Sequence, residues 1–397
     1  MLPVVLVAVA VIAGGARLGG DDGTGFPGVV LGRTPSAAEP STGVPVVPIA
    51  PSTGPAPAAT AAPAEPPVDA FAAVDFGAWR ALAAQYMDDD SLSNGSVDLP
   101  YGANVFAARI YGGGPVPAYS FYEAGGGAFS SSFYVASSIK LMAALGALTY
   151  VNSLGFDGEA TIDGGYTIHD IYDSALRYSD NDDYSWLVRI AGTDWLNRQF
   201  LPSEGFSATS IQEAYGGGDE QVAYSPPMTL TEGGKSLDVD ERSGYDDYGC
   251  GGGNCSDLFD LADAIRRVVL DSEIPKSERF QVAPNDIAGL QDSLNGAESW
   301  VGPGVYDALG PDVQIYSKPG WVGGLDCVDA ALVIDPGTGR RYLIAISVPD
   351  YGDECADVAT MAGQVITALN AHDNGYAIRT DGEVVSVANG KQVAPQR

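Results

Sequence analysis

Three short strings in the sequence hold side chains of the types that acyl transfer needs. They read SSIK at 137–140, SDN at 179–181 and KPG at 318–320. In this order they supply a nucleophilic hydroxyl, groups that carry a proton, and a cation beside a glycine, where a carboxylate-bearing ligand can approach the backbone closely. The combination predicts an enzyme that works through a serine.

The first string places a hydroxyl and an amine one helical turn apart. Ser137 comes at the start of an apolar run that we expect to be a buried helix, so the helix N-terminus favours negative charge on its oxygen. Lys140 follows three residues later on the same face and can reach that hydroxyl. Burial of the amine lowers its pKa and makes it a base near neutral pH. The alternative is a serine cap followed by a lysine that extends to solvent.

The other two strings also have structural alternatives. Ser179 and Asn181 lie between two predicted helices, where they offer a hydroxyl for proton relay and an amide for a substrate carbonyl, or simply form a turn and a helix cap. Lys318 lies in a predicted strand and is suited to a carboxylate, or is a surface lysine beside an edge proline. The sequence has only five lysines, and two of them are Lys140 and Lys318.

Composition limits the partners of the protein. The 397 residues include 51 acidic and 20 basic side chains, a formal net charge of −31, which disfavours nucleic acid and anionic membrane surfaces as partners. The 51 glycines and 26 prolines indicate that much of the chain is loop and linker. We expect one large domain, and a monomer.

The first 69 residues differ from the rest. Residues 1–20 contain a short apolar run followed by small residues, typical of a signal peptide or of a membrane anchor, although a basic start is missing. Residues 21–69 are rich in Pro and Ala and predict a disordered linker. The folded domain is expected at 70–371 and a short tail at 372–397. The protein is therefore expected outside the cell or in the cell envelope, exported or anchored by its N-terminus.

Four cysteines lie at 250, 255, 327 and 355, all in the part expected to be exported. An even number in such a chain predicts disulfides, and of the three possible pairings we favour Cys250 with Cys255 and Cys327 with Cys355. A zinc site would need a different spacing, and the chain has only two histidines. We expect no metal and no cofactor.

Apolar periodicity predicts a mixed α/β domain. Helices are expected at 76–87, 137–150, 168–178, 183–190, 256–270, 285–294 and 355–369, and strands at 105–111, 116–122, 314–322, 329–334 and 342–348. Strands at both ends with helices between them imply an antiparallel sheet that both chain ends build, with a mainly helical region inserted in the middle.

In this order the three strings resemble the active-site serine family that contains class A β-lactamases and penicillin-binding D-alanyl-D-alanine peptidases. The resemblance extends over about 75–369 and includes Phe133 before the nucleophile and the stretch YTIHDIYDSALRYSDND that leads into the second string. It implies the two-part α/β fold of that family, an acyl-enzyme, and a β-lactam or a peptidoglycan stem peptide as substrate.

The resemblance also implies roles for individual residues. Ser137 would be acylated and Lys140 would activate it. Ser179 would pass a proton to the leaving amine, Asn181 would hold the substrate amide, and Lys318 would bind the carboxylate. The oxyanion would lie between the N–H groups of Ser137 and of Trp321, which follows Gly320.

Two departures separate the chain from that pattern. Pro319 stands where the family has Thr, so carboxylate recognition is expected to be weaker or differently arranged. The E-x-x-L-N loop whose Glu activates the hydrolytic water is absent; its Glu position falls on Tyr215, and Glu213, two residues away, is the candidate base.

Other classes of protein fit less well. A Ser-His-Asp hydrolase needs a catalytic histidine and a G-x-S-x-G string, and the sequence has no such string. The remaining alternative is a catalytically impaired cell-wall binding or sensor module of the same fold. The intact first and second strings argue against it, whereas Pro319 and the absent Glu loop argue for it.

Overall fold

The structure is a computed structural model, and it describes residues 75–393 except for 89, 94, 131–132, 213–214, 216–223, 245–252, 351 and 353–354. Residues 1–74 lie outside the described residues. They comprise the predicted leader (1–20), the predicted linker (21–69) and the first residues of the predicted domain. A division of the chain by its contacts places one compact unit at Val68–Arg397.

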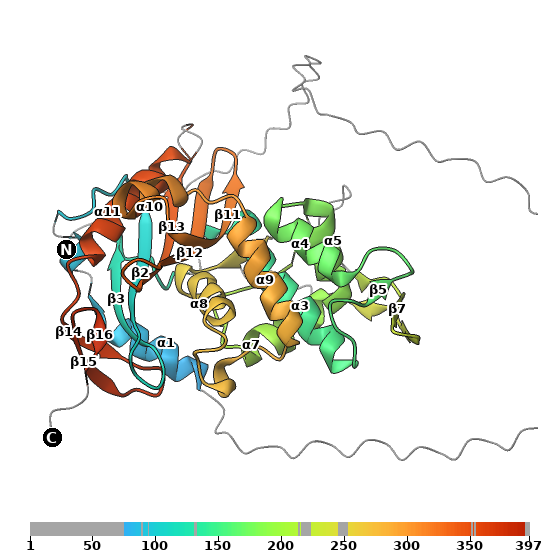
Figure 1. Ribbon diagram of the computed structural model, residues 1–397. Helices are drawn as coiled ribbons and strands as arrows, with labels where there is room; N and C mark the ends of the chain where they lie inside the picture. Colours follow the sequence, from blue (N-terminus) through green and yellow to red (C-terminus); the bar gives the residue numbers. More distant parts are fainter. Residues whose placement is uncertain are drawn as a thin grey trace, which may run out of the picture. The chain divides into compact units, whose positions relative to one another are not determined.

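A nine-stranded, mostly antiparallel sheet forms one half of this unit (Figure 1). Its strand order is β11-β12-β13-β2-β3-β14-β15-β16, and β1 adds to β3 in parallel. The bounds are Met87–Asp88 (β1), Asn104–Tyr111 (β2), Ala118–Ala124 (β3), Gln314–Val322 (β11), Asp326–Asp335 (β12), Arg340–Pro349 (β13), Gly375–Ile378 (β14), Val384–Ala388 (β15) and Lys391–Gln392 (β16). The sheet thus joins strands from both ends of the chain, as the sequence predicted.

The helices lie on both faces of the sheet and in a separate region beside it (Figure 1). Their bounds are Phe76–Gln85 (α1), Lys140–Ser153 (α3), Ile168–Arg177 (α4), Asn181–Ala191 (α5), Leu258–Val269 (α8), Pro284–Gly296 (α9), Gly302–Leu309 (α10) and Ala356–Leu369 (α11). Shorter helical segments are Asp90–Ser93 (α2), Thr193–Trp195 (α6), Leu201–Ser203 (α7), Ala136–Ile139 (η1), Leu196–Phe200 (η2) and Lys276–Glu278 (η3). The helical region holds α3, α4 and α5, the segment predicted as an insertion.

Small strands complete the structure, and several of them border the helical region. Their bounds are Phe133–Tyr134 (β4), Thr161–Ile162 (β5), Tyr224–Ser225 (β6), Met228–Glu232 (β7), Lys235–Val239 (β8), Arg242–Ser243 (β9) and Cys255–Ser256 (β10). β5, β7 and β8 form a three-stranded sheet, and β4 pairs with β10.

Alternating side chains of the central strands divide the core into two. On β2, Phe106 and Ala108 belong to the cluster shared with α1, α8 and the helical region, whereas Val105 and Ala107 belong to the cluster under α10 and α11. This period of two is expected of strands that are covered on both faces. The sheet is therefore the middle layer between two sets of helices.

The predicted elements agree with the structure to within a few residues, with one correction at the C-terminus. Residues 372–397 were predicted as a tail outside the domain, yet β14, β15 and β16 extend the sheet, and Ile378 pairs with Tyr119 of β3. The stretch was mistaken for a tail because its strands are short and bury few apolar side chains, which is typical of strands at the edge of a sheet. The domain therefore continues to at least Gln392.

Buried ion pairs fix α8 inside the molecule. Arg266 is fully buried and binds Asp263 (2.7 Å) and Glu278 (2.9 Å), and it also donates to the hydroxyl of Tyr119 (3.1 Å). Its neighbour Arg267 is equally buried and pairs with Glu204. Each buried guanidinium thus has a carboxylate in direct contact, as low-dielectric surroundings require.

One predicted disulfide is present. Cys327 of β12 is bonded to Cys355 at the start of α11, which confirms that pair. Cys250 lies outside the described residues, so its pairing with Cys255 stays a prediction.

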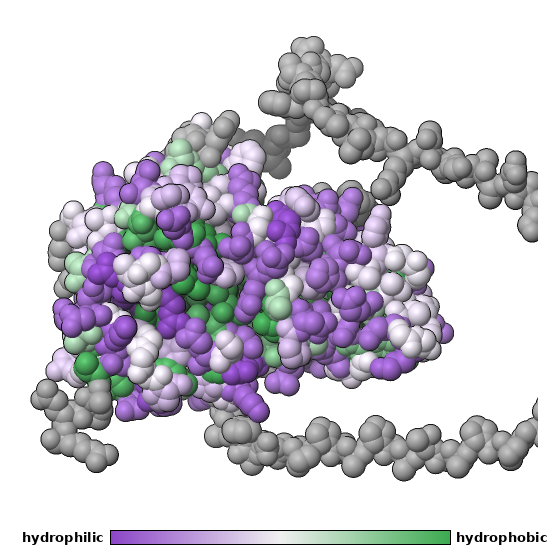
Figure 2. All heavy atoms as spheres, in the orientation of Figure 1, coloured by the Kyte–Doolittle hydropathy of each residue, from purple (hydrophilic) through white to green (hydrophobic). Residues whose placement is uncertain are grey.

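The surface is largely polar. Hydrophilic residues cover most of the face in Figure 2, with hydrophobic residues visible mainly around the sheet and α8. Within the described part of the chain, none of the helices has the length and hydropathy needed to cross a bilayer. Nor do the described residues contain a group of three or more His, Cys, Asp or Glu side chains placed to hold a metal ion.

Candidate active site

Ser137 lies in the turn that leads into the buried helix. The turn η1 has 3-10 geometry and ends where α3 begins at Lys140, so the α-helix starts one turn later than the predicted start at Ser137. The residue before it, Ala136, has a left-handed backbone (φ 47°), which is costly for a residue with a Cβ. No hydrogen bond to the Ser137 hydroxyl is found among the described residues, so this oxygen is available to a ligand.

Gly320 lets the edge strand come very close to this turn. A Cβ at position 320 would lie 2.4 Å from the carbonyl oxygen of Val135 and 2.8 Å from the nitrogen of Ser137, distances that real Cβ atoms do not adopt. Only glycine therefore permits β11 to run directly against η1. This contact brings the third string beside the first.

Lys140 is fully buried and is surrounded by oxygen atoms of the second string. Its Nζ donates to the carbonyl oxygens of Ser179 (2.5 Å) and Asp180 (3.1 Å) and to Oδ1 of Asn181 (2.7 Å), with the Ser179 hydroxyl at 3.4 Å. No ion pair joins it to a carboxylate of the described residues. The sequence predicted a contact with Ser137, and among the hydrogen bonds of the described residues none joins those two side chains.

These surroundings make the amine of Lys140 a base at neutral pH. Burial and, after it, the positive charge of Lys318 lower the pKa of Lys140, whereas Asp180 and Asp183 act in the opposite direction. The result is a pKa of about 7. A large fraction of the molecules therefore carries an uncharged amine at pH 7.

Ser179 connects the two lysines. Its hydroxyl accepts a hydrogen bond from Lys318 Nζ (3.0 Å) and lies 3.4 Å from Lys140 Nζ. Its backbone is left-handed (φ 58°), so the chain turns sharply between α4 and α5. The turn is stabilised by the next residue, Asp180, which caps α5 by accepting from the backbone N–H of Asp183 (2.9 Å). Asp180, which caps α5, therefore directly follows Ser179, whose hydroxyl is predicted to relay a proton.

Lys318 is buried in β11 beside a buried acid. Burial lowers its pKa to about 8, while the charges of Asp329 and Glu298 oppose that shift. Asp329 is fully buried, and burial raises its pKa to about 6, although it accepts hydrogen bonds from Ser317 and from the backbone of Trp300 and Val301. Because acids lie nearby, Lys318 keeps its charge to a higher pH than Lys140.

Tyr215 closes the other side of the site. Its hydroxyl donates to the carbonyl of Ala136 (3.1 Å), the residue with the left-handed backbone. Its ring stacks on Tyr184 (4.6 Å between centroids), and both rings lie within 6 Å of Lys140 Nζ, at 5.7 and 5.8 Å from their centroids. A ring face near an ammonium is favourable. Tyr215 thus lies against both the turn that carries Ser137 and the amine of Lys140.

A pocket of about 470 Å³ opens over these residues. It is lined by Ser137, Leu176, Arg177, Tyr178, Ser179, Asn181, Glu298, Trp300, Lys318, Pro319, Gly320 and Trp321. Polar groups that converge in such a concave space are the usual mark of a binding site. The three strings, far apart in the sequence, therefore meet in one pocket.

The structure brings most of the predicted site residues together. Five of them, together with Gly320 and Trp321, lie in or directly under the pocket; the five are Ser137, Lys140, Ser179, Asn181 and Lys318. The proposed general base Glu213 lies outside the described residues and stays a prediction.

Sequence reasoning missed Glu298 and Trp300 in the pocket lining and the buried Asp329 behind it. Asp329 has a recognisable signal, because it is the lone acid in the apolar run of a predicted strand. Glu298 and Trp300 lie between α9 and α10 and carry no such signal. They reach the site because Asp329 binds the backbone of that segment.

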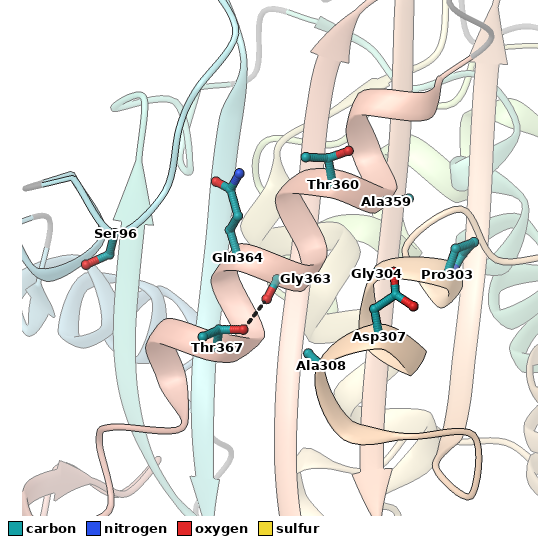
Figure 3. A pocket seen from close by; sticks show the side chains of 10 residues that line it. All are labelled: Ser96, Pro303, Gly304, Asp307, Ala308, Ala359, Thr360, Gly363, Gln364 and Thr367. Atoms are coloured by element: carbon teal, nitrogen blue, oxygen red, sulfur yellow. Dashed lines mark hydrogen bonds between the residues drawn. The ribbon is translucent and has the colours of Figure 1, made fainter.

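A second cavity, of about 490 Å³, lies between α10 and α11 (Figure 3). Small and polar side chains such as Gly304, Gly363 and Thr367 line it, and the hydroxyl of Thr367 is already bonded to the carbonyl of Gly363 (2.7 Å). Asp307 is its one charged lining residue. It lacks the serine and lysine pair that defines the first pocket.

Comparison with known proteins yields structural likeness alone. No family model matches the chain, and no curated protein does. Similar solved structures include a mutant of the penicillin-binding protein PBP-A as an acyl-enzyme with penicillin G (15% identity, TM-score 0.47, 74% of this chain and 97% of that one). Others are class A β-lactamases from Mycobacterium abscessus (17%, 0.46, 74% and 98%) and from Bacteroides cellulosilyticus (17%, 0.45, 74% and 98%). These identities and TM-scores leave the function of this chain to be argued from its own residues.

Proposed function

We propose that this protein is a serine hydrolase that acts through an acyl-enzyme at Ser137 on β-lactams or on amides of the D-Ala-D-Ala type. One observation carries the proposal. Lys140 is fully buried, no carboxylate of the described residues pairs with it, and its pKa is lowered to about 7. A protein gains no stability from such a lysine, whereas catalysis needs a base with this pKa.

In the proposed acylation step, Lys140 acts as the base and Ser137 as the nucleophile. The uncharged amine of Lys140 takes the proton of the Ser137 hydroxyl as the oxygen attacks the substrate carbonyl. The nucleophile and the amine lie one helical turn apart, at the junction of η1 and α3. Negative charge on the carbonyl oxygen would be stabilised by the backbone N–H groups of Ser137 and Trp321, which the contact at Gly320 brings near each other.

Breakdown of the tetrahedral intermediate needs a proton on the leaving nitrogen. The hydroxyl of Ser179 is suited to supply it, because it lies between Lys140, which has just become protonated, and Lys318. The amine of Lys140 thereby returns to its uncharged state, and the acyl group stays on Ser137. Asn181 would orient the substrate amide through its side-chain nitrogen, since its oxygen is bonded to Lys140.

Lys318 provides positive charge at the floor of the pocket, where a substrate carboxylate would bind. Pro319 offers no hydroxyl beside it, so the carboxylate has one fewer hydrogen-bond donor. We expect binding of the carboxylate to depend mainly on charge.

Labelling of the full chain tests the proposal. A fluorescent penicillin should label the wild-type protein, and Ser137→Ala should remove the label while circular dichroism stays unchanged. Ser138→Ala is the matched control, because this neighbouring hydroxyl is bonded to the carbonyl of Val135 (2.5 Å) and should not be acylated. Labelling that survives Ser137→Ala would refute the assignment of the nucleophile.

A chromogenic β-lactam then separates hydrolysis from stable acylation. Repeated turnover that Ser137→Ala abolishes supports a β-lactamase, whereas one equivalent of product without turnover supports a D-Ala-D-Ala peptidase or a sensor module. Among the described residues that line the pocket, Glu298 is the one carboxylate. Glu213, the predicted base for deacylation, is not described, so turnover itself tests whether the protein has such a base. Absence of any labelling would overturn the substrate class.

A further inference from the structure

The pocket carries a carboxylate to which none of the described residues is bonded. Glu298 lies between α9 and α10, lines the pocket and is exposed to solvent. No hydrogen bond or ion pair to its carboxylate is found among the described residues. The other charged residues of the lining are Lys318, in the floor, and Arg177, which is already paired with Asp173 (3.0 Å) and Asp292 (2.7 Å).

Three aromatic residues line the same pocket as Glu298, namely Tyr178, Trp300 and Trp321, and the indole N–H of Trp321 is already bonded to Asp350 (2.8 Å). Tyr178 is 75% exposed at the end of α4, and Trp300 is half-buried two residues after Glu298. The backbone of Trp300 is held by Asp329 (2.8 Å), which fixes the segment that carries Glu298. A carboxylate and aromatic rings that line one pocket suit an organic cation, since ring faces and carboxylates both attract positive charge.

The position of these residues indicates which part of a substrate they contact. Tyr178 immediately precedes Ser179, the hydroxyl that faces both lysines, and Glu298 is close enough to Lys318 to affect its pKa. Under the mechanism proposed above, Ser179 serves the leaving group. The carboxylate and the rings of Tyr178 and Trp300 therefore belong to the leaving-group side of the pocket.

We propose that Glu298, Tyr178 and Trp300 form a subsite for a cationic centre on the leaving-group side of the substrate. The preferred acyl donors then carry a carboxylate for Lys318 and, beyond it, an ammonium or pyridinium group for Glu298. The net charge of −31 favours the same class, because it raises the local concentration of cationic ligands. This inference rests on the proposed acyl transfer at Ser137, and it specifies the substrates of that reaction.

A matched pair of β-lactams tests the subsite. Cephaloridine and cephalothin share their acyl side chain, nucleus and carboxylate, and they differ by a pyridinium or an acetoxy group on the leaving-group side. The full chain should be acylated by the cationic compound about 5-fold to 30-fold faster, the range expected of cation–π and ionic contacts in a partly desolvated pocket. Mass spectrometry of the adduct, or competition with a fluorescent penicillin, gives both second-order rates.

Substitution shows which side chain is responsible. Glu298→Gln should reduce the ratio of the two rates to near one while the rate with cephalothin changes little. Tyr178→Ala should lower the ratio, and Tyr178→Phe, which retains the ring, should preserve it. Glu159→Gln is the control. Glu159 is exposed and lies outside the pocket, and its substitution removes the same charge from the protein. An unchanged ratio in Glu298→Gln would overturn the inference.

Binding without chemistry keeps the subsite testable if acylation fails. Titration of the Ser137→Ala protein with benzylamine and with benzyl alcohol, followed by calorimetry, should show saturable binding of the amine that Glu298→Gln abolishes. If neither cephalosporin acylates the protein but benzylamine binds in this way, the proposed reaction is wrong and the cationic subsite stands. If both compounds acylate and the amine does not bind, the subsite is wrong and the reaction stands.

Discussion

Both α8 and the candidate active site bury positive charge, and the surroundings of that charge differ between these two regions. In α8, Arg266 and Arg267 are buried, and each contacts a carboxylate directly. In the candidate active site, Lys140 and Lys318 are buried just as completely, yet their hydrogen bonds go to hydroxyl, carbonyl and amide oxygens. The first arrangement places a carboxylate in direct contact with each cation, whereas in the second the acids act on the lysines only from a greater distance.

The difference separates structural from catalytic use of a buried cation. A guanidinium paired with carboxylates stays charged at every relevant pH and holds elements together. An amine surrounded by neutral oxygens changes its protonation near neutral pH, at a cost in stability that only a chemical role explains. The comparison predicts that substitutions in the two regions have opposite consequences.

The largest expected effects come from a matched pair of variants. Arg266→Met leaves Asp263 and Glu278 as buried, unpaired carboxylates, so the free energy of unfolding should fall by about 3–5 kcal/mol. Lys140→Met leaves only neutral acceptors, and the free energy of unfolding should fall by no more than about 1–2 kcal/mol. Acylation of Ser137, however, should become about 10²–10⁴ times slower in Lys140→Met.

Urea denaturation and the rate of labelling by a fluorescent penicillin measure the two quantities. Arg266→Met should keep its labelling rate at temperatures where it remains folded. A Lys140→Met protein that labels at the normal rate would contradict the role of the amine, and an Arg266→Met protein of full stability would remove the contrast between the regions.

A smaller effect is expected in the dependence of acylation on pH. Lys140 acts as a base only when uncharged, so acylation should slow as the pH falls below about 7. Lys318 attracts the substrate only when charged, so acylation should also slow above about pH 8, which leaves an optimum between the two values.

Lys318→Met sharpens this test. It should remove the alkaline limb and move the acid limb to a higher pH, because the charge of Lys318 helps to lower the pKa of Lys140. The rate with a substrate that lacks a carboxylate should be affected least. An acid limb that stays at the wild-type pH would show that the two lysines are not coupled.

The smallest effect concerns Tyr215. Tyr215→Phe removes the hydrogen bond to the carbonyl of Ala136 and keeps the ring beside Lys140. The strained turn before Ser137 then loses a contact of about 0.5–1.5 kcal/mol, and acylation should slow several-fold. Stopped-flow measurement of labelling checks this, with Tyr166→Phe, an exposed tyrosine outside the pocket, as the control. Equal rates in both variants would mean that the bond does not position the nucleophile.

The candidate site was predictable where chemistry is local in sequence. Ser137 and Lys140 are one turn apart, and the string at 179–181 was predicted between two periodic helices. This spacing was enough to predict the roles that we propose for these residues. The contact through Gly320 was not predictable, because it joins a strand to a turn that is remote in sequence. Asp329 and Glu298 depend on the same kind of tertiary contact, and so does the bond pattern of Lys140.

The fold shows the same division. The strand 314–322 was predicted with its observed bounds because its apolar pattern is strong, and the sheet from both chain ends follows from the order of elements. The strands β14 to β16 were missed because edge strands bury few side chains and resemble a polar tail. The apolar pattern of a sequence indicates which residues are buried. Strands that bury few side chains therefore cannot be recognised from that pattern.

The pairing of β2 with β13, and of β3 with β14, joins segments of the chain that are synthesised far apart in time. During synthesis the nucleophile and its base emerge early, while the central partner strands of β2 and β3 are more than half a chain away. Pairings this distant in sequence form slowly. A nascent or truncated chain that ends before β11 holds Ser137 and Lys140 but lacks the strand that contacts their turn. If Ser137 is acylated as proposed, labelling with a penicillin therefore requires that β11 has joined the sheet.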